Sequence, residues 1–164
     1  MPSFDITSEF NQQEVTNAID QMNREIINRY DFKDTNTSVS FSNSTISLRS
    51  TTEERLNAAD QVLREKFAKR NVSIKFLSNF NDEQTPSEAK REYTLKSGLD
   101  KEISKIIVKD LKEFSKKIQS SIQDQSIRVS SKKRDELQDA ISYLKEKNYK
   151  VFLNYGNFRD WNVI

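Results

Sequence analysis

An internal duplication constrains this chain more than any other feature of its sequence. The stretch TISLRSTTEERLNAADQVLREK, residues 45–66, returns as SIRVSSKKRDELQDAISYLKEK, residues 126–147. The apolar positions coincide at a constant offset of 81, as in Ile46 with Ile127 and Leu63 with Leu144. Self-similarity of this kind indicates a duplicated supersecondary unit. Half of a 164-residue chain suffices for a small two-layer core.

Both halves predict the order strand, helix, strand, strand, helix, strand. Alternating and helical apolar spacing places these elements in the first half at 3–8, 11–29, 37–41, 45–49, 51–67 and 72–80. In the second half they fall at 89–97, 99–117, 118–123, 126–131, 133–147 and 149–155. This order is the βαββαβ pattern of ferredoxin-like domains. We therefore expect an α+β fold of two ferredoxin-like two-layer sandwich lobes.

Two local signals set the expected boundaries. Thr51 and Glu54 have the spacing of a capping box at the start of the second helix. Residues 81–88, NDEQTPSE, contain Pro86 and no large apolar side chain, which favours a linker. The expected division is a first lobe over 1–80, the linker, and a second, basic lobe over 89–164.

Composition excludes several classes of function. The chain has no His and no Cys, so it lacks imidazole bases, thiolate nucleophiles and the metal sites built from these ligands. Its two glycines cannot form a Walker loop or a dinucleotide-binding turn. No spacing singles out a catalytic carboxylate pair. We expect a protein that is not an enzyme and needs no cofactor. No apolar run would span a membrane and no signal peptide is evident, so we expect it in the cytoplasm.

Positive charge is concentrated in the second half. Residues 1–88 carry 10 Lys and Arg against 14 Asp and Glu, whereas residues 89–164 carry 17 against 11. Arg128, Lys132, Lys133 and Arg134 cluster there, the last three at the start of a predicted helix, where the helix dipole is already positive. The first copy has ThrThrGluGlu at 51–54 instead. A bound anion would relieve this repulsion, although a solvated cluster with Asp135 and Glu136 explains it as well.

A basic ridge is expected on the preceding helix. Lys101, Lys105, Lys109, Lys112 and Lys116 share one face, opposite an apolar stripe. Such a face either is simply solvated or contacts phosphate groups. Gly98, between Lys96 and Lys101, either makes a turn or lets the backbone approach a phosphate.

The segment RYDFK, residues 29–33, offers aromatic side chains beside cations. Tyr30 or Phe32 could stack on a base while Arg29 or Lys33 meets its phosphate. A helix end that packs one ring into the core is the alternative. The strands TISLR and SIRVS carry no aromatic residue, which argues against base stacking in the manner of RNA-recognition domains.

Five ordered blocks carry a resemblance to a known family. They are PSFDI at 2–6, RYDF at 29–32, KSGLDKEI at 96–103, IRVSSKKRDELQ at 127–138 and NFRD at 157–160. With these blocks the chain resembles the bacterial YajQ family over essentially its whole length. It departs from that pattern at Ser131, where a glycine is common, and in its last residues, WNVI.

The resemblance implies a nucleotide-binding protein of two ferredoxin-like lobes that exchange their first strands. Members are associated with nucleotides or RNA, and some with sensing cyclic diguanylate. We therefore expect a non-enzymatic protein that binds nucleotide or RNA. Its phosphate contacts would come from Lys96, Gly98, Lys101, Lys105, Arg128, Lys132, Lys133 and Arg134, with Tyr30 or Phe32 as stacking partners. The alternative is a cyclic-diguanylate-responsive adaptor acting on a protein or DNA partner.

Overall fold

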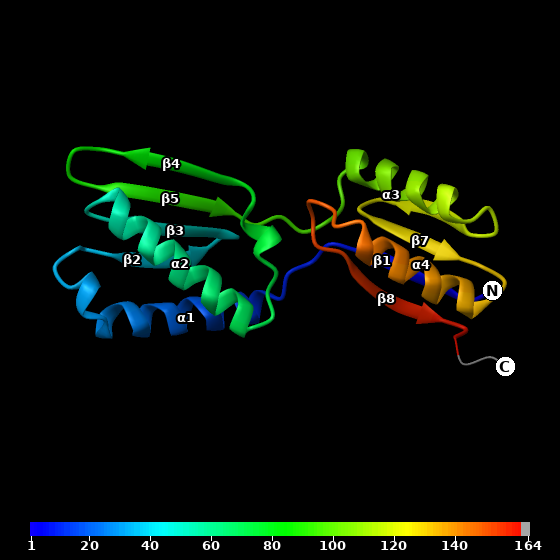
Figure 1. The fold of residues 1–164 in the computed structure, drawn as a ribbon, viewed down its shortest axis with the longest axis horizontal. Coiled ribbons are helices and arrows are strands. Elements are labelled where there is room, and N and C mark those ends of the chain that lie inside the picture. Colours follow the sequence, from blue (N-terminus) through cyan, green and yellow to red (C-terminus); the bar gives the residue numbers. More distant parts are fainter. Residues whose placement is uncertain (162–164) are drawn as a thin grey trace. The chain divides into compact units, whose positions relative to one another are not determined.

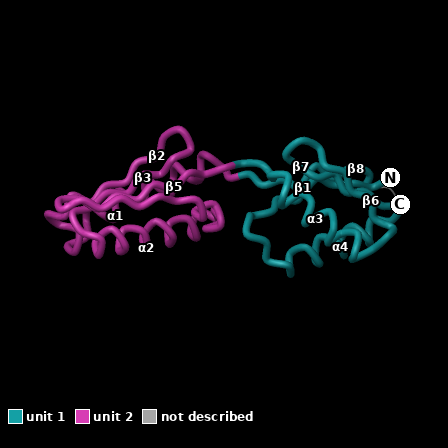
Figure 2. Tube along the Cα trace, turned by 90° about the horizontal axis from the view of Figure 1, so that it is seen from above, with its two compact units in different colours: residues 1–9, 97–164 teal, residues 10–96 magenta. Residues whose placement is uncertain are grey.

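The structure is a computed structural model and describes residues 1–161. It divides the chain into two compact units, which are distinguished by colour in Figure 2. Unit 1 consists of residues 1–9 and the chain from 97 onward, and unit 2 consists of residues 10–96. Each unit has a sheet covered by two helices (Figures 1 and 2). The α+β class and the duplicated βαββαβ order predicted from the sequence are confirmed.

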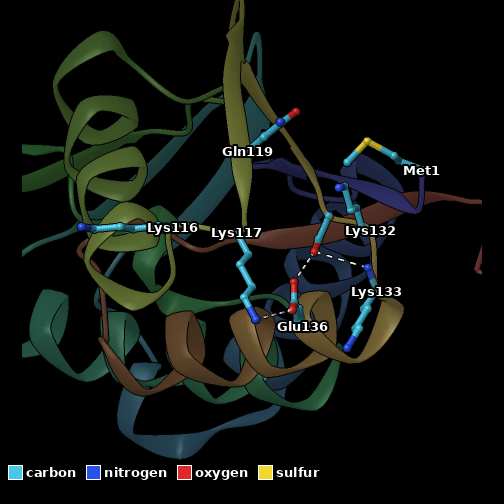
Figure 3. A pocket seen from close by; sticks show the side chains of 8 residues that line it. Met1, Lys116, Lys117, Gln119, Lys132, Lys133 and Glu136 are labelled. Atoms are coloured by element: carbon cyan, nitrogen blue, oxygen red, sulfur yellow. Dashed lines mark hydrogen bonds and ion pairs between the residues drawn. The ribbon is translucent and has the colours of Figure 1, made fainter.

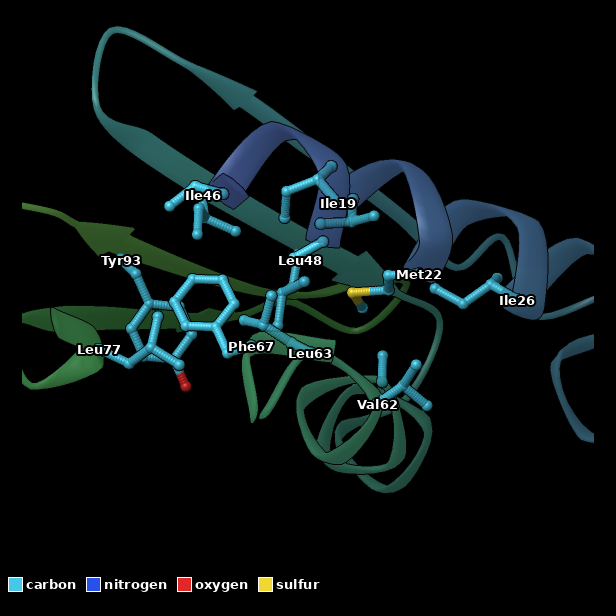
Figure 4. Close-up of a cluster of buried hydrophobic side chains, with 14 of the residues drawn as sticks. Ile19, Met22, Ile26, Ile46, Leu48, Val62, Leu63, Phe67, Leu77 and Tyr93 are labelled. Atoms are coloured by element: carbon cyan, nitrogen blue, oxygen red, sulfur yellow. The ribbon is translucent and has the colours of Figure 1, made fainter. Parts of the chain in front are cut away.

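Unit 2 contains a four-stranded antiparallel sheet in the order β2-β3-β5-β4. Its strands are β2 (Ser38–Ser42), β3 (Thr45–Ser50), β4 (Phe80–Gln84) and β5 (Ala89–Thr94). The helices α1 (Gln12–Asn28) and α2 (Glu53–Lys69) pack on the sheet, with short 3₁₀ turns at Tyr30–Phe32 and Ile74–Leu77. Figure 4 shows the core between the layers, where Leu48, Leu63 and Phe67 are fully buried.

Unit 1 repeats this arrangement in the sheet order β6-β7-β1-β8. Its strands are β1 (Ser3–Thr7), β6 (Gln119–Gln123), β7 (Ser126–Ser130) and β8 (Asn154–Arg159). Its helices are α3 (Lys101–Phe114) and α4 (Arg134–Glu146). Phe4 and Ile6 of β1 are fully buried in the core that Ile127 and Val129 of β7 also enter.

The first strand of each half lies in the sheet of the other half. β1 is hydrogen-bonded between β7 and β8, and β5 is hydrogen-bonded between β3 and β4. Burial explains the placement, because Phe4 and Ile6 fill one core while Ala89 and Tyr93 fill the other. The chain therefore passes between the units twice, after residue 9 and after residue 96.

The structure differs from the expected boundaries around the middle of the chain. The expected strand at 72–80 is replaced by a 3₁₀ turn at Ile74–Leu77 with irregular residues on either side. The consecutive residues Phe76 and Leu77 are both buried, which differs from the alternation of a half-buried strand. The linker expected at 81–88 instead contributes β4 and the turn to β5. β4 is exposed at all five positions, so apolar alternation does not reveal it.

Two further boundaries are shifted. The last strand begins at Asn154 and not at residue 149, because its ladder with β1 starts with the pair of Thr7 and Asn154. The cap of α2 is Thr52, whose hydroxyl accepts the Arg55 N–H at 3.2 Å, and not Thr51.

Candidate functional site

A basic pocket of about 390 Å³ lies in unit 1, between the connection from α3 to β6 and the start of α4 (Figure 3). Four lysines contribute to its lining, two from the connection and two from the helix start: Lys116, Lys117, Lys132 and Lys133. The remaining lining residues are Met1, Gln119, Ser131 and Glu136. A volume of this size suits a small ligand.

The helix that begins at the pocket has an unusual cap. The N-cap residue of α4 is Lys133, with extended backbone angles and no side-chain hydrogen bond to the helix. The other three α-helices in residues 1–161 begin at capping side chains, which are Asn11, Thr52 and Asp100. A lysine has no acceptor, so backbone N–H groups of the first turn of α4 lack a side-chain cap. Such a helix start favours an anion.

One carboxylate lies among the lysines of the pocket. Glu136 accepts a short hydrogen bond from the hydroxyl of Ser131, and its other oxygen lies 4.0 Å from Lys117 Nζ (Figure 3). Ser131 is fully buried and its Oγ also accepts the Lys133 N–H at 3.4 Å. In Figure 3 the side chain of Lys116 extends away from the other labelled residues, so the positive charge next to Glu136 comes from Lys117, Lys132 and Lys133.

The positions equivalent to the four lysines carry no charge in unit 2. At the repeat offset of 81, the four lysines correspond to Thr35, Asn36, Thr51 and Thr52. Thr35 Oγ1 lies 2.6 Å from Thr37 Oγ1, which lies 2.9 Å from the hydroxyl of Ser50, the counterpart of Ser131. Hydroxyl groups therefore bond to each other in one copy, whereas lysines line a pocket in the other.

Comparison with known proteins identifies the family of this chain. Residues 2–159 match the family described as "Nucleotide-binding protein YajQ-like". This chain belongs to the YajQ-like family. It is similar to a "Nucleotide-binding protein" of Hahella chejuensis, at 39% identity over 98% of this chain and 100% of the relative. A protein of the same name from Trichormus variabilis is 42% identical over 96% of this chain and 97% of the relative. Another from Coxiella burnetii is 38% identical over 98% of this chain and 100% of the relative.

Only part of the predicted phosphate cluster of this YajQ-like chain lines the pocket. Lys132 and Lys133 do, whereas Arg134 donates from a guanidinium nitrogen to the Trp161 carbonyl at 2.8 Å. Arg128 lies on the other face of the sheet from the helices, because Ile127 and Val129 beside it are buried under them.

Arg128 is already paired on that open face. Its Nε donates to Asp5 at 3.2 Å, and Asn157 Nδ2 donates to the same carboxylate at 2.7 Å. Burial tends to raise the pKa of Asp5, but these hydrogen bonds and the charge of Arg128 outweigh it and lower the pKa overall. Arg128 thus has a structural partner that sequence inspection could not identify.

The residues predicted around Gly98 are not brought to the pocket. Lys96 is the last residue of unit 2, whereas Gly98 belongs to unit 1 and makes a turn with φ +100°, its N–H donating to the Ser8 carbonyl. Lys101 and Lys105 are exposed near the start of α3, which is capped by Asp100. α3 is about 20 Å long at 1.5 Å per residue, and the pocket lies beyond its other end.

The two predicted stacking residues have different surroundings in unit 2. Phe32 is 5% exposed, packs in the core and lies under the Arg29 guanidinium, so it cannot stack on a base. Tyr30 is 88% exposed beside a hollow of about 490 Å³ that Arg29 and Lys33 also line. Arg29 itself is bonded to Glu25 and Asp31. A stacking role for Tyr30 stays a prediction.

The sequence did not single out Lys117 or Glu136 as site residues. A helix was expected to run to residue 117, which would place Lys116 on the basic ridge of that helix. α3 instead ends at Phe114, and the following turn carries Lys116 and Lys117 to the pocket. The available signal was the duplication, which aligns both lysines with neutral residues of the first copy.

Within residues 1–161, no group of three or more carboxylates is placed to hold a metal ion. None of the helices described there combines the length and the apolar character needed to cross a membrane.

Proposed function

We propose that the pocket of unit 1 binds the phosphate groups of a nucleotide, without catalysing its conversion. One observation carries the proposal: four neutral positions of one repeat are lysines in the other, around a pocket at a helix start without a side-chain cap. Family membership and the names of the relatives support nucleotide as the ligand.

The chemistry of the lining favours phosphate over other anions. Lysine ammonium groups act as point charges that tolerate several phosphate orientations, and the first backbone N–H groups of α4 add directed donors. The exposed side chain of Met1 and the methylene stems of the lysines supply apolar contact for the nucleoside.

Binding without turnover is the simplest reading of the same lining. The chain has no His or Cys, and the carboxylate of Glu136 is engaged by Ser131 and lies close to Lys117. A general base with an available proton-accepting position is therefore not evident among the residues that line this pocket.

Calorimetric titration with AMP, ADP and ATP at low salt tests the proposal. Affinity should rise with the number of phosphates, and Lys132→Ala should weaken binding about fivefold, as expected for about 1 kcal/mol. The matched control is Lys109→Ala, which removes the same charge from α3 outside the pocket. Equal losses in both variants would mean that only general charge matters.

Cyclic diguanylate and a short single-stranded RNA serve as further titrants. A ligand held in the pocket should make few phosphate contacts, so its affinity should fall gently with salt. RNA that follows the exposed lysines of α3 would lose affinity steeply, and Lys109→Ala would then matter as much as Lys132→Ala. Absence of binding by every titrant at low salt would refute the proposed function.

A further inference from the structure

Each sheet has two edge strands, and one side of each edge strand has no neighbouring strand. Two of these four edges, β4 and β8, are protected from pairing by their own residues. β4 carries Asp82 and Glu83, and charges on an edge discourage pairing with another chain. β8 has an irregular register with β1 and a left-handed residue, Asn157, at φ 51°. A bulged edge does not offer a straight row of donors and acceptors.

The remaining edges, β2 and β6, are equivalent strands of the two repeats and differ in protection. On β2, the side chain of Asn23 from α1 donates to the outward carbonyl of Val39 at 3.4 Å. β6 has the sequence QSSIQ, with no charge, no proline and a regular ladder with β7. Among the described residues, β6 is the edge with none of these protective devices.

The hairpin geometry identifies the outward backbone groups of β6. A two-residue turn closes on the pair of Gln123 and Ser126, so Gln123, Ser121 and Gln119 bond to β7. The N–H and C=O groups of Ser120 and Ile122 therefore point away from the sheet. No side chain described in residues 1–161 bonds to them, and Ile122 is 43% exposed.

We propose that β6 pairs with β6 of a second copy of this chain, antiparallel and centred on Ser121. In this register Ser120 of each copy faces Ile122 of the other, and four backbone hydrogen bonds form without disturbing β7. The strand is self-complementary, because Ser121 meets Ser121 and Gln119 meets Gln123 across the two-fold axis.

Charge complementarity at the ends of the strand supports a second copy as the occupant. Because the two strands are antiparallel, Lys117, which precedes β6 in one copy, comes to the end of the pair where Asp124 follows β6 in the other copy. Lys117 is 78% exposed, and Asp124 is exposed at the tip of the hairpin turn. The two-fold axis repeats this contact at the opposite end.

Sedimentation velocity of the full chain at rising concentration tests the proposal. A single pair of five-residue strands buries little surface, so the association belongs to the weak class and should be sought up to about 1 mM. Ser121→Lys places two like charges at the axis and should abolish the shift from monomer to dimer. The matched control Ser40→Lys changes the equivalent exposed position of β2 and should leave the shift intact.

A second variant guards against misfolding of the first. Asp124→Asn keeps the left-handed turn residue while removing the charge, so it should weaken association severalfold and make it less sensitive to salt. A wild-type chain that stays monomeric throughout the range would overturn the proposal. So would a dimer that Ser121→Lys leaves unchanged or that Ser40→Lys disrupts equally. None of these outcomes depends on nucleotide binding.

Discussion

Replacing Lys133 with Thr should stabilise unit 1 and weaken nucleotide binding at the same time. Lys133 has φ −121° and ψ 129°, close to the φ −132° and ψ 155° of its counterpart Thr52. The hydroxyl of Thr52 accepts the Arg55 N–H, so Thr at 133 is placed to accept the N–H of Glu136. The cap should contribute about 1 kcal/mol, and loss of a cation from the helix start a few tenths more.

Thermal unfolding followed by circular dichroism measures the stability change. For a unit of this size that melts by itself, 1 kcal/mol corresponds to about 4–8 °C in Tm. The buffer must be free of phosphate and nucleotide, because a bound anion would stabilise the wild type and mask the difference. The reciprocal variant Thr52→Lys removes the cap of α2 and should destabilise unit 2 by about 1 kcal/mol.

Nucleotide affinity should move in the opposite direction from stability in Lys133→Thr. Loss of one ammonium group from the pocket should weaken ADP binding about fivefold, equivalent to about 1 kcal/mol. A more stable variant with unchanged affinity would refute a role for Lys133 in phosphate binding. A less stable variant would refute the claim that the helix start of α4 lacks a cap.

Three further predictions concern the fold. Gly98→Ala should destabilise unit 1 by about 1–3 kcal/mol in urea unfolding, because Gly98 has φ +100°, a backbone conformation that L side chains rarely adopt. Burial raises the pKa of Tyr155 to about 12, against about 10 when unfolded, so stability should be lost as pH rises between these values. Tyr155→Phe should reduce that loss in unfolding curves across the range. Leu63→Ala, at a fully buried site, should cost about 2–5 kcal/mol by chemical denaturation.

The fold was largely predictable because the duplication preserves apolar spacing in the strands and helices that enclose each core. β3 and β7 lie where the repeat places them, and so do α2 and α4. β4 escaped prediction since all its residues are exposed and only Phe80 is apolar, and its place in the sheet depends on hydrogen bonds to β5. Apolar periodicity in a sequence arises when one face of an element is buried. An exposed edge strand such as β4 has no buried face and therefore shows no such periodicity.

The site was predictable only in part, for a different reason. Comparing the copies identified Lys132 and Lys133 at the helix start. The side chains of residues that are close in sequence, however, do not all point toward the same site. Arg128 alternates to the open face of the sheet and bonds Asp5, 123 residues away, and Arg134 bonds Trp161. Which cations converge is decided by the tertiary partners of each side chain.

In the two repeats a helix cap and the proposed phosphate site occupy the same position. The hydroxyl of Thr52 accepts a backbone N–H of α2, so fewer N–H groups at the start of α2 remain to bind an anion. Lys133 leaves the equivalent donors of α4 without a side-chain cap and adds a charge that attracts phosphate. The same exchange at Thr35, Asn36 and Thr51 replaces neutral polar groups with ammonium groups. The uncapped start of α4 lowers the stability of unit 1, and a bound anion would restore that stability. The affinity of unit 1 for the anion is therefore linked to the stability of the unit.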